Sequence, residues 1–345
     1  MIAYIIRRLF LLPIVLIGLS LLIFGMMQLL SPYDRLSTYV RDPAQLKQGP
    51  EVLQQLMDKY GLNDPIWVQY GRWLNNVIHG NLGYSESANM EVTKAIMRFL
   101  PATAQLALFA AIPVVFGGIW LGMVSAVHHN GLIDHTTRIM ALTGWSLPTF
   151  VMGLLLLMIF YGWLGWFPSG ELSNWAARIV DSPQFVRYTG MNAIDAILNG
   201  NLAVLGDTLR HIVLPVFTLA YVQWALLLRV MRSSMLETLR QDYITTARAK
   251  GVAERVVIKK HARANALLPV ITIAGVMVAG LLRGVVITET IFNYHGLGLF
   301  AVQAAQQLDF SAIIGFALFT GMLMILTNLI VDLLYAYIDP RVKLG

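Results

Sequence analysis

Several apolar runs in this sequence are long enough to cross a lipid bilayer. A helix needs about 20 mainly apolar residues to span the hydrocarbon core, and runs of this kind recur from the N-terminal region to the end of the chain. Hydrophobic residues make up 57% of the 345 residues, and charged residues only 13%. A water-soluble domain would leave these runs exposed, so the sequence predicts an all-α, polytopic membrane protein.

We expect six transmembrane helices, at about 9–30, 101–127, 139–164, 211–228, 267–292 and 312–338. The first run follows Arg7 and Arg8, a layout that signal peptides share. It is longer than the apolar core of a signal peptide and lacks a small-residue cleavage site, so we interpret it as a retained helix. Residues 1–100 then form an N-terminal helix with an extracytoplasmic segment, and 101–345 form a core transmembrane domain of five helices.

The segment 31–100 is predicted to be a folded appendage outside the membrane. It carries seven basic and seven acidic residues. In PEVLQQLMDKYGL, apolar side chains recur at helical spacing at Leu53, Leu56, Met57 and Tyr60. A linker would not need this periodicity.

Lys and Arg residues in the loops predict the orientation, because cytoplasmic loops carry their excess. The loop from Arg229 to Arg263 has nine basic residues and three acids, whereas 165–210 has three basic residues and four acids. Arg7, Arg8, Arg341 and Lys343 flank the two ends. Both termini and the 229–266 loop are therefore expected in the cytoplasm, and the net charge of +6 is better explained by orientation than by nucleic-acid binding.

The stretch DYITTARAKGVAERVVIKKHARANALLP, residues 242–269, predicts a helix, a glycine turn and a second helix. Asp242 can cap a helix over 243–250, Gly251 suits a left-handed closing position, and 252–263 can form the next helix. These charges could simply anchor the flanking spans. The small residues of the first helix instead favour docking of another protein, with Ile244 and Ala247 as a shallow apolar face.

These residues resemble the cytoplasmic loop motif of binding-protein-dependent ABC importer permeases. The motif positions correspond to Thr245, Thr246, Ala247 and Gly251, followed after nine residues by His261. Thr245 replaces the usual Glu, and Leu268-Pro269 comes five residues late; both departures are typical of the dipeptide, oligopeptide and nickel branch. Four further segments look like that branch: YGLNDPIWVQYGRWLNNVIHGNLGYS (60–85), RFLPATAQLAL (98–108), LGWFPSG (164–170) and ETIFNYHGLGL (289–299).

The resemblance implies a type I ABC importer permease that works only in a complex. A homologous second permease subunit would complete the pore, two ATPase subunits or domains would bind ATP and Mg, and an extracytoplasmic binding protein would deliver substrate. No Walker A sequence occurs in this chain, so no cofactor and no catalytic role are expected here. The residues expected to couple to the ATPase are Asp242, Thr245, Thr246, Ala247, Lys250, Gly251 and Arg255.

Four polar residues are candidates for the translocation pathway. Arg283 lies within the fifth span, where an ionisable side chain is costly and therefore suggests function; pairing with a partner acid and snorkelling are the alternatives. Glu289, at the outer end of that span, suggests a gate or interface. Gln303 and Gln306 lie on a predicted outer helix over 299–307 that could line a vestibule.

Peptides are the expected substrate, with oligosaccharides or nickel as alternatives within the same transporter class. The insertion at 171–207, with Trp175, Phe185 and Tyr188, is expected to contact the binding protein without naming the ligand. An ion-gradient-driven secondary transporter is the different class to keep open, but it would usually show buried acids or broken spans in two repeated halves. A membrane-embedded enzyme would need a clustered catalytic constellation, which the sequence does not suggest.

Overall fold

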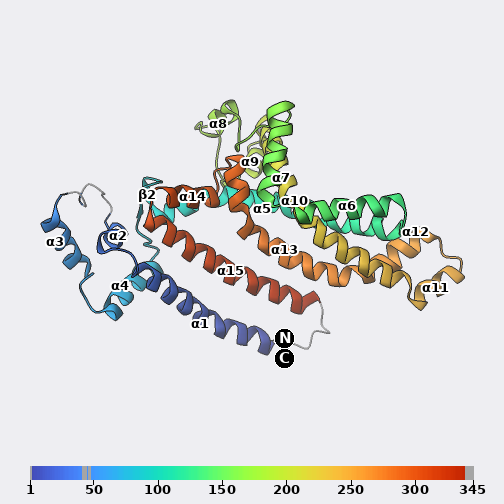
Figure 1. Ribbon diagram of the computed structural model, residues 1–345, viewed down its shortest axis with the longest axis horizontal. Coiled ribbons are helices and arrows are strands. Elements are labelled where there is room, and N and C mark those ends of the chain that lie inside the picture. Colours follow the sequence, from blue (N-terminus) through green and yellow to red (C-terminus); the bar gives the residue numbers. More distant parts are fainter. Residues whose placement is uncertain (1, 41–44, 46–47, 339–345) are drawn as a thin grey trace. The chain divides into compact units, whose positions relative to one another are not determined.

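The computed structural model describes the backbone of residues 2–40, 45 and 48–338, and it is almost entirely helical (Figure 1). Side chains are described in these ranges except at 2–9, 279, 282–284 and 332–338. The all-α expectation is confirmed, apart from two short antiparallel strands, β1 (Tyr84–Ser85) and β2 (Met90–Glu91). Two compact units are present: the first joins residues up to Ala102 with His295–Ala336, and the second is Thr103–Tyr294.

Five long helices in the described part of the chain supply apolar stretches able to cross a membrane, which matches five of the predicted spans. Within a bilayer only intrahelical pairing satisfies the backbone polar groups of a single segment, so these runs fold as helices. They are α1 (Ile2–Met27), α5 (Val92–Val127), α10 (Leu202–Leu239), α13 (Arg263–Phe292) and α15 (Phe310–Ile338).

The predicted span over 139–164 is broken, so the expectation of one continuous helix there is wrong. Helix α6 (Leu132–Ser146) ends before Leu147 and Pro148, where the chain bends by 108°. Helix α7 (Thr149–Leu156) begins after the bend and continues into the π-helix η2 (Leu157–Trp163). Leu147 is extended, at φ −89° and ψ 125°, because a following proline disfavours the helical conformation. If this bent pair and a second one near the end of α13 each cross the membrane, the count rises from five to seven. The count of six stays a prediction.

The appendage of the first unit is folded, as predicted. Its helices are α2 (Pro32–Ser37), α3 (Pro50–Tyr60) and α4 (Ile66–Ile78). Leu36, Leu56 and Leu62 form a buried cluster, against which Leu53 and Met57 of the predicted apolar stripe pack. A second cluster joins α4 to the transmembrane helices α1 and α15, which lie side by side (Figure 1).

In the second unit, small residues let α5 approach α10 closely. A Cβ at Gly118 would lie 2.7 Å from the Cβ of Leu227, and one at Gly122 would lie 2.6 Å from the Cβ of Met231. These glycines are four residues apart and therefore on one face of α5, the spacing by which small residues pack membrane helices. At one end of α10 and α13 lie α11 (Asp242–Ala249) and α12 (Glu254–Val256), away from α8 (Asn174–Val180) and α9 (Asn192–Leu198) (Figure 1).

Asp309 fastens the hairpin of the first unit to the start of α15. Its carboxylate accepts hydrogen bonds from the Ser85 hydroxyl at 2.6 Å and from the backbone and hydroxyl of Ser87 at 3.0 and 2.8 Å. It also caps α15 by accepting from the Ala312 amide at 3.0 Å. One buried carboxylate thus holds two segments that are far apart in sequence.

We predict that Asp309→Ala destabilises the protein by about 3 kcal/mol, because it leaves buried donors without an acceptor. The measurement is the thermal unfolding midpoint of the purified protein in detergent, followed by tryptophan fluorescence. Asp58→Ala is the control, since Asp58 is exposed and accepts a hydrogen bond from Asn63, five residues along the chain. Equal losses in the two variants would contradict the fastening role.

Candidate functional site

The loop between α10 and α13 is a helix, a glycine turn and a second helical segment, as predicted. Helix α11 ends in a Schellman motif, in which the Gly251 amide donates to the Arg248 carbonyl at 2.9 Å and the Val252 amide to Ala247 at 3.2 Å. Gly251 is left-handed, at φ +74°, as the sequence suggested. The second segment begins at Glu254, continues as the π-helix η3 (Val257–Ala262) and runs directly into α13.

Asp242 does not cap α11, so that prediction is wrong. The helix begins at Asp242 itself, the preceding Gln241 is the extended N-terminal residue, and no side chain caps the helix. A carboxylate in the first turn still interacts favourably with the helix dipole. The Thr246 hydroxyl donates to the Asp242 carbonyl within the same helix, at 2.9 Å.

The apolar face of α11 points into the protein. Ile244 is fully buried, and α11 packs against η3, where Val257 is also fully buried. The expectation that Ile244 helps to form a docking face is therefore wrong, because its side chain anchors α11 to this chain. Of the residues expected to couple to the ATPase, Asp242, Thr245, Thr246, Lys250, Gly251 and Arg255 are exposed, and Ala247 is half-buried. Tyr243 and Val256 of the same loop are also exposed.

An ion pair that the sequence did not reveal closes the glycine turn. Arg248 donates from Nη2 and Nε to the two carboxylate oxygens of Glu254, at 2.6 and 3.1 Å. These hydrogen bonds hold the pKa of the Glu254 carboxyl below its usual range. The two residues are six positions apart, and only the reversal at Gly251 brings them together. The pair links α11 to α12 on the exposed side of the turn.

A buried ion pair ties the α5–α6 turn to α10. The Asp134 carboxylate is fully buried and accepts from Arg232 Nε at 2.7 Å and Nη2 at 2.8 Å. It also accepts from the Ser125 hydroxyl at 2.6 Å and the Asn130 amide at 3.0 Å. Sequence reasoning missed this site because its two charged residues are 98 positions apart. The signals available in the sequence were an acid, Asp134, just after the second predicted span and an arginine, Arg232, just after the fourth.

The predicted pathway residues are divided between the two units: Arg283 and Glu289 belong to the second, and Gln303 and Gln306 to the first. Glu289 is fully buried in the second unit and accepts a hydrogen bond from the Thr103 hydroxyl at 2.6 Å. Arg283 belongs to α13, but its side chain lies outside the described residues. Gln303 and Gln306 are exposed on α14 (Leu297–Gln306), which confirms the expected helix; its position on the outer side stays a prediction. The pathway role of all four stays a prediction.

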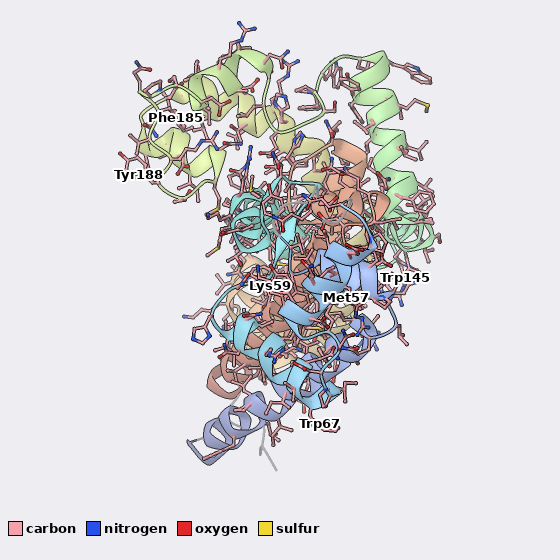
Figure 2. The ribbon with its side chains drawn as sticks, turned by 90° about the vertical axis from the view of Figure 1, so that its left-hand side faces the viewer. Met57, Lys59, Trp67, Trp145, Phe185 and Tyr188 are labelled. Atoms are coloured by element: carbon pink, nitrogen blue, oxygen red, sulfur yellow. The ribbon has the colours of Figure 1, made fainter. Side chains whose placement is uncertain are left out.

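The insertion at 171–207 is a small folded subdomain of the second unit. Phe185 is buried there in a cluster with Ala176 and Val180, whereas Trp175 and Tyr188 are 47% and 61% exposed. Phe185 and Tyr188 are labelled in Figure 2. Gln105 of α5 accepts a hydrogen bond from the Ala193 amide at 2.7 Å and so secures α9. Of the three aromatic residues singled out, only Trp175 and Tyr188 are therefore available for an external partner.

Comparisons with known proteins match nearly the whole length of the chain. The family described as the binding-protein-dependent transport system inner membrane component matches residues 118–344, and its N-terminal part matches 1–107. The chain is 41% identical over 309 residues to the probable D,D-dipeptide transport system permease protein DdpB of Escherichia coli (strain K12), covering 88% of this chain and 89% of that protein.

Two further relatives are matched almost end to end. The dipeptide transport system permease protein DppB of Alkalihalophilus pseudofirmus is 38% identical over 343 residues, with 99% and 100% of the two chains covered. The oligopeptide transport system permease protein AppB of Bacillus subtilis (strain 168) is 37% identical over 348 residues, again with 99% and 100% covered.

We predict that Asp134→Ala destabilises the second unit by about 3–5 kcal/mol, because it leaves the Arg232 guanidinium without its buried partner. Combining it with Arg232→Leu should restore part of this loss. Thermal unfolding in detergent measures both effects. Asp181→Ala is the control: it removes an equally short pair with Arg187, at 2.7 Å, whose side chains are 71% and 54% exposed, so it should cost about 0–1 kcal/mol. A similar cost for both single variants would contradict the prediction.

Proposed function

Because this chain belongs to the family of binding-protein-dependent transport system inner membrane components, we propose that it forms one half of the translocation pathway of an ATP-driven importer. A homologous second permease subunit forms the other half. An extracytoplasmic binding protein delivers the substrate, and two ATPase subunits or domains supply the energy. The single observation that carries this proposal is the exposed helical loop between α10 and α13, which a glycine turn closes and the buried Ile244 anchors.

The loop transmits force because it is continuous with two membrane helices. Helix α10 leads into α11 through Arg240 and Gln241 alone, and η3 passes directly into α13. The Arg248–Glu254 pair and the buried Ile244 fix α11 relative to these helices. A push on the exposed residues Thr245, Thr246 and Arg255 therefore moves α10 and α13 rather than bending the loop, as coupling between two states requires.

The loop and both termini lie in the cytoplasm in this proposal, and the membrane is the inner membrane of a prokaryote. The excess of Lys and Arg between Arg229 and Arg263 supports this orientation. The insertion with α8 and α9 then lies outside, where Trp175 and Tyr188 are accessible to the binding protein. Six membrane crossings follow if the bent α6–α7 segment spans the membrane once.

Di- or oligopeptides are the proposed substrates. The printed names of the relatives specify D,D-dipeptide, dipeptide and oligopeptide transport, and the similarity extends over nearly the full length of the chain. We expect labelled dipeptide to enter proteoliposomes that contain the assembled complex, only when the binding protein outside and ATP at the ATPase face are both present. Uptake that runs on an ion gradient without ATP would contradict the proposal.

A pull-down from detergent-solubilised native membranes tests the coupling loop. With this chain as bait, we expect wild type to retain the ATPase subunits. Ala247→Glu places a charge on the proposed contact, and Gly251→Pro cannot adopt the positive φ of the Schellman turn. Both variants should lose most of the ATPase while keeping the second permease.

Ala177→Glu is the matched control, because Ala177 is also half-buried on a short helix, α8, in the same unit. It should retain ATPase as wild type does. Retention of ATPase by both loop variants would remove α11 as the docking element. Failure of wild type to retain any ATPase under conditions that preserve the permease pair would overturn the importer proposal.

A further inference from the structure

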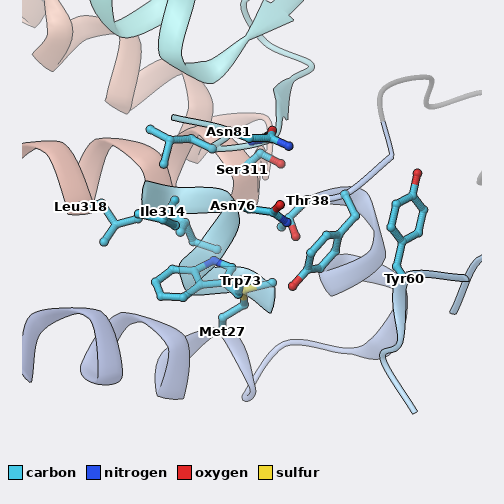
Figure 3. Close-up of a pocket in the computed structure, with 13 residues that line it drawn as sticks. Met27, Thr38, Tyr60, Trp73, Asn76, Asn81, Ser311, Ile314 and Leu318 are labelled. Carbon is cyan, nitrogen blue, oxygen red and sulfur yellow. The ribbon is translucent and has the colours of Figure 1, made fainter. Parts of the chain in front are cut away.

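The first unit contains a polar cavity at the edge of its membrane helices. The cavity has a volume of about 280 Å³. In Figure 3, Asn81 and Ser311 lie on one side, Met27 and Trp73 lie on the other, and Asn76 extends between them. Amide and hydroxyl groups therefore face apolar side chains across a small space, an arrangement suited to an amphipathic ligand.

Three cations lie near the two tyrosines that line the cavity. Tyr39 and Tyr60 both line the cavity and stack at 5.7 Å. Arg35 and Arg72 lie close enough to the Tyr39 phenol to oppose the rise in its pKa that burial causes, and Lys59 lies over the Tyr60 ring, at 5.6 Å.

The two arginines differ in their hydrogen-bond and ion-pair partners. Arg72 pairs with Asp64 at 2.6 Å. Arg35 donates one hydrogen bond to Gln28, but its Nε is buried and has no partner among the described residues. Arg35 does not itself line the cavity but lies near Tyr39, which does. A buried guanidinium donor left open at this place favours an anionic oxygen as its partner.

An apolar groove of about 500 Å³ continues from this cavity. Val77, Leu82 and Leu318 line both spaces. Beyond them the groove is bounded by α1, the start of α5 and α15, with Leu16, Met97 and Met322 among its residues. Its volume lies within the range of about 300–1,000 Å³ that is typical of small-ligand sites.

The cavity and the groove together extend over a depth close to the hydrocarbon thickness of one bilayer leaflet. Ser311, in the cavity, lies in the first turn of α15, and Met322, in the groove, is 11 residues further along that helix. At 1.5 Å per residue this is about 16 Å, close to half of the ~30 Å hydrocarbon core. Tyr39, Tyr60 and Trp73 lie at the polar end, where interfacial aromatic residues gather.

We propose that the first unit binds one anionic glycerophospholipid, with its headgroup phosphate at the polar cavity near Arg35 and an acyl chain in the groove beneath Leu82 and Leu318. The lipid belongs to the leaflet on the side of the appendage. In the proposed orientation that leaflet is the extracytoplasmic one. Only this choice of leaflet rests on the proposed function; the lipid site itself does not. Bound in this way, the lipid fills the space between α1, α4 and α15 and stabilises the appendage against the membrane.

Native mass spectrometry of the intact complex, purified in detergent, tests the site. Phosphatidylglycerol or phosphatidylethanolamine is titrated into delipidated complex, and bound lipid is counted. Wild type should bind one phosphatidylglycerol in preference to phosphatidylethanolamine. Met322→Trp fills the groove and should lower occupancy by about tenfold or more, because the buried acyl chain supplies most of the binding free energy.

Met324→Trp is the control for the groove, since Met324 is 42% exposed, against 43% for Met322, but does not line it. It should bind lipid as wild type does. Arg35→Gln should reduce the preference for phosphatidylglycerol by about fivefold, as expected for one interfacial cation. Lys94→Gln removes an exposed charge elsewhere in the first unit and should leave the preference unchanged.

A photoreactive acyl-chain phospholipid supplies a second measurement that needs no variant. In native membranes carrying the wild-type complex, labelling should map to peptides around Leu16, Leu82 and Met322. Retention of lipid by Met322→Trp, or labelling spread evenly over all the membrane helices, would overturn the proposal. So would a helix of the second permease crosslinked into the groove. Because lipid is counted directly, these outcomes are independent of whether the complex imports peptides.

Discussion

Backbone amide and carbonyl groups must find partners inside the protein wherever water is excluded, and this constraint organises the whole chain. The five long helices satisfy it by intrahelical hydrogen bonding. The constraint becomes informative where regular pairing fails, at Leu147 and Pro148, in η2 and in η3. Proline at 148 removes a donor and forces the preceding residue out of the helix, so α6 and α7 meet at a sharp bend. Of the two π-helical segments, η2 follows α7, and η3 connects α12 to α13.

The sequence was most informative where a signal was periodic or local. Apolar runs of sufficient length located five spans, the stripe from Leu53 to Tyr60 located α3, and Gly251 located the turn of the coupling loop. The broken span was not predicted because the residues from 139 to 164 are mainly apolar and favour one continuous helix. Pro148 was the signal in the sequence for the break. The cap at Asp242 failed for a related reason: the pattern fits a helix beginning one residue earlier or later, and only backbone geometry decides between them.

Side-chain direction was harder to predict than helix position. Ile244 and Ala247 are three residues apart and were both assigned to an outward face, yet Ile244 is fully buried and Ala247 only half-buried. The sequence of α11 alone does not say which side meets η3, because η3 supplies the apolar surface. The Arg248–Glu254 pair depends in the same way on the reversal between its members. In this loop a buried apolar side chain anchors α11 to its own chain, and the exposed side is left for the partner.

Buried aspartates show how the chain compensates for backbone donors that leave regular pairing at turns. Asp134 accepts from the Asn130 amide, Asp195 from the Thr189 and Gly190 amides, and Asp309 from the Ser87 and Ala312 amides. Each carboxylate also accepts from at least one hydroxyl. The partners of Asp195 are close in sequence, whereas Asp309 joins segments 222 residues apart. No local sequence pattern therefore identifies aspartates that are buried at turns in this way. A negative charge costs free energy to bury, and it is tolerated at these turns because several donors converge on it. The same reasoning separates Asp134, whose charge Arg232 neutralises, from Asp195 and Asp309, which hydrogen bonds to uncharged donors hold in place.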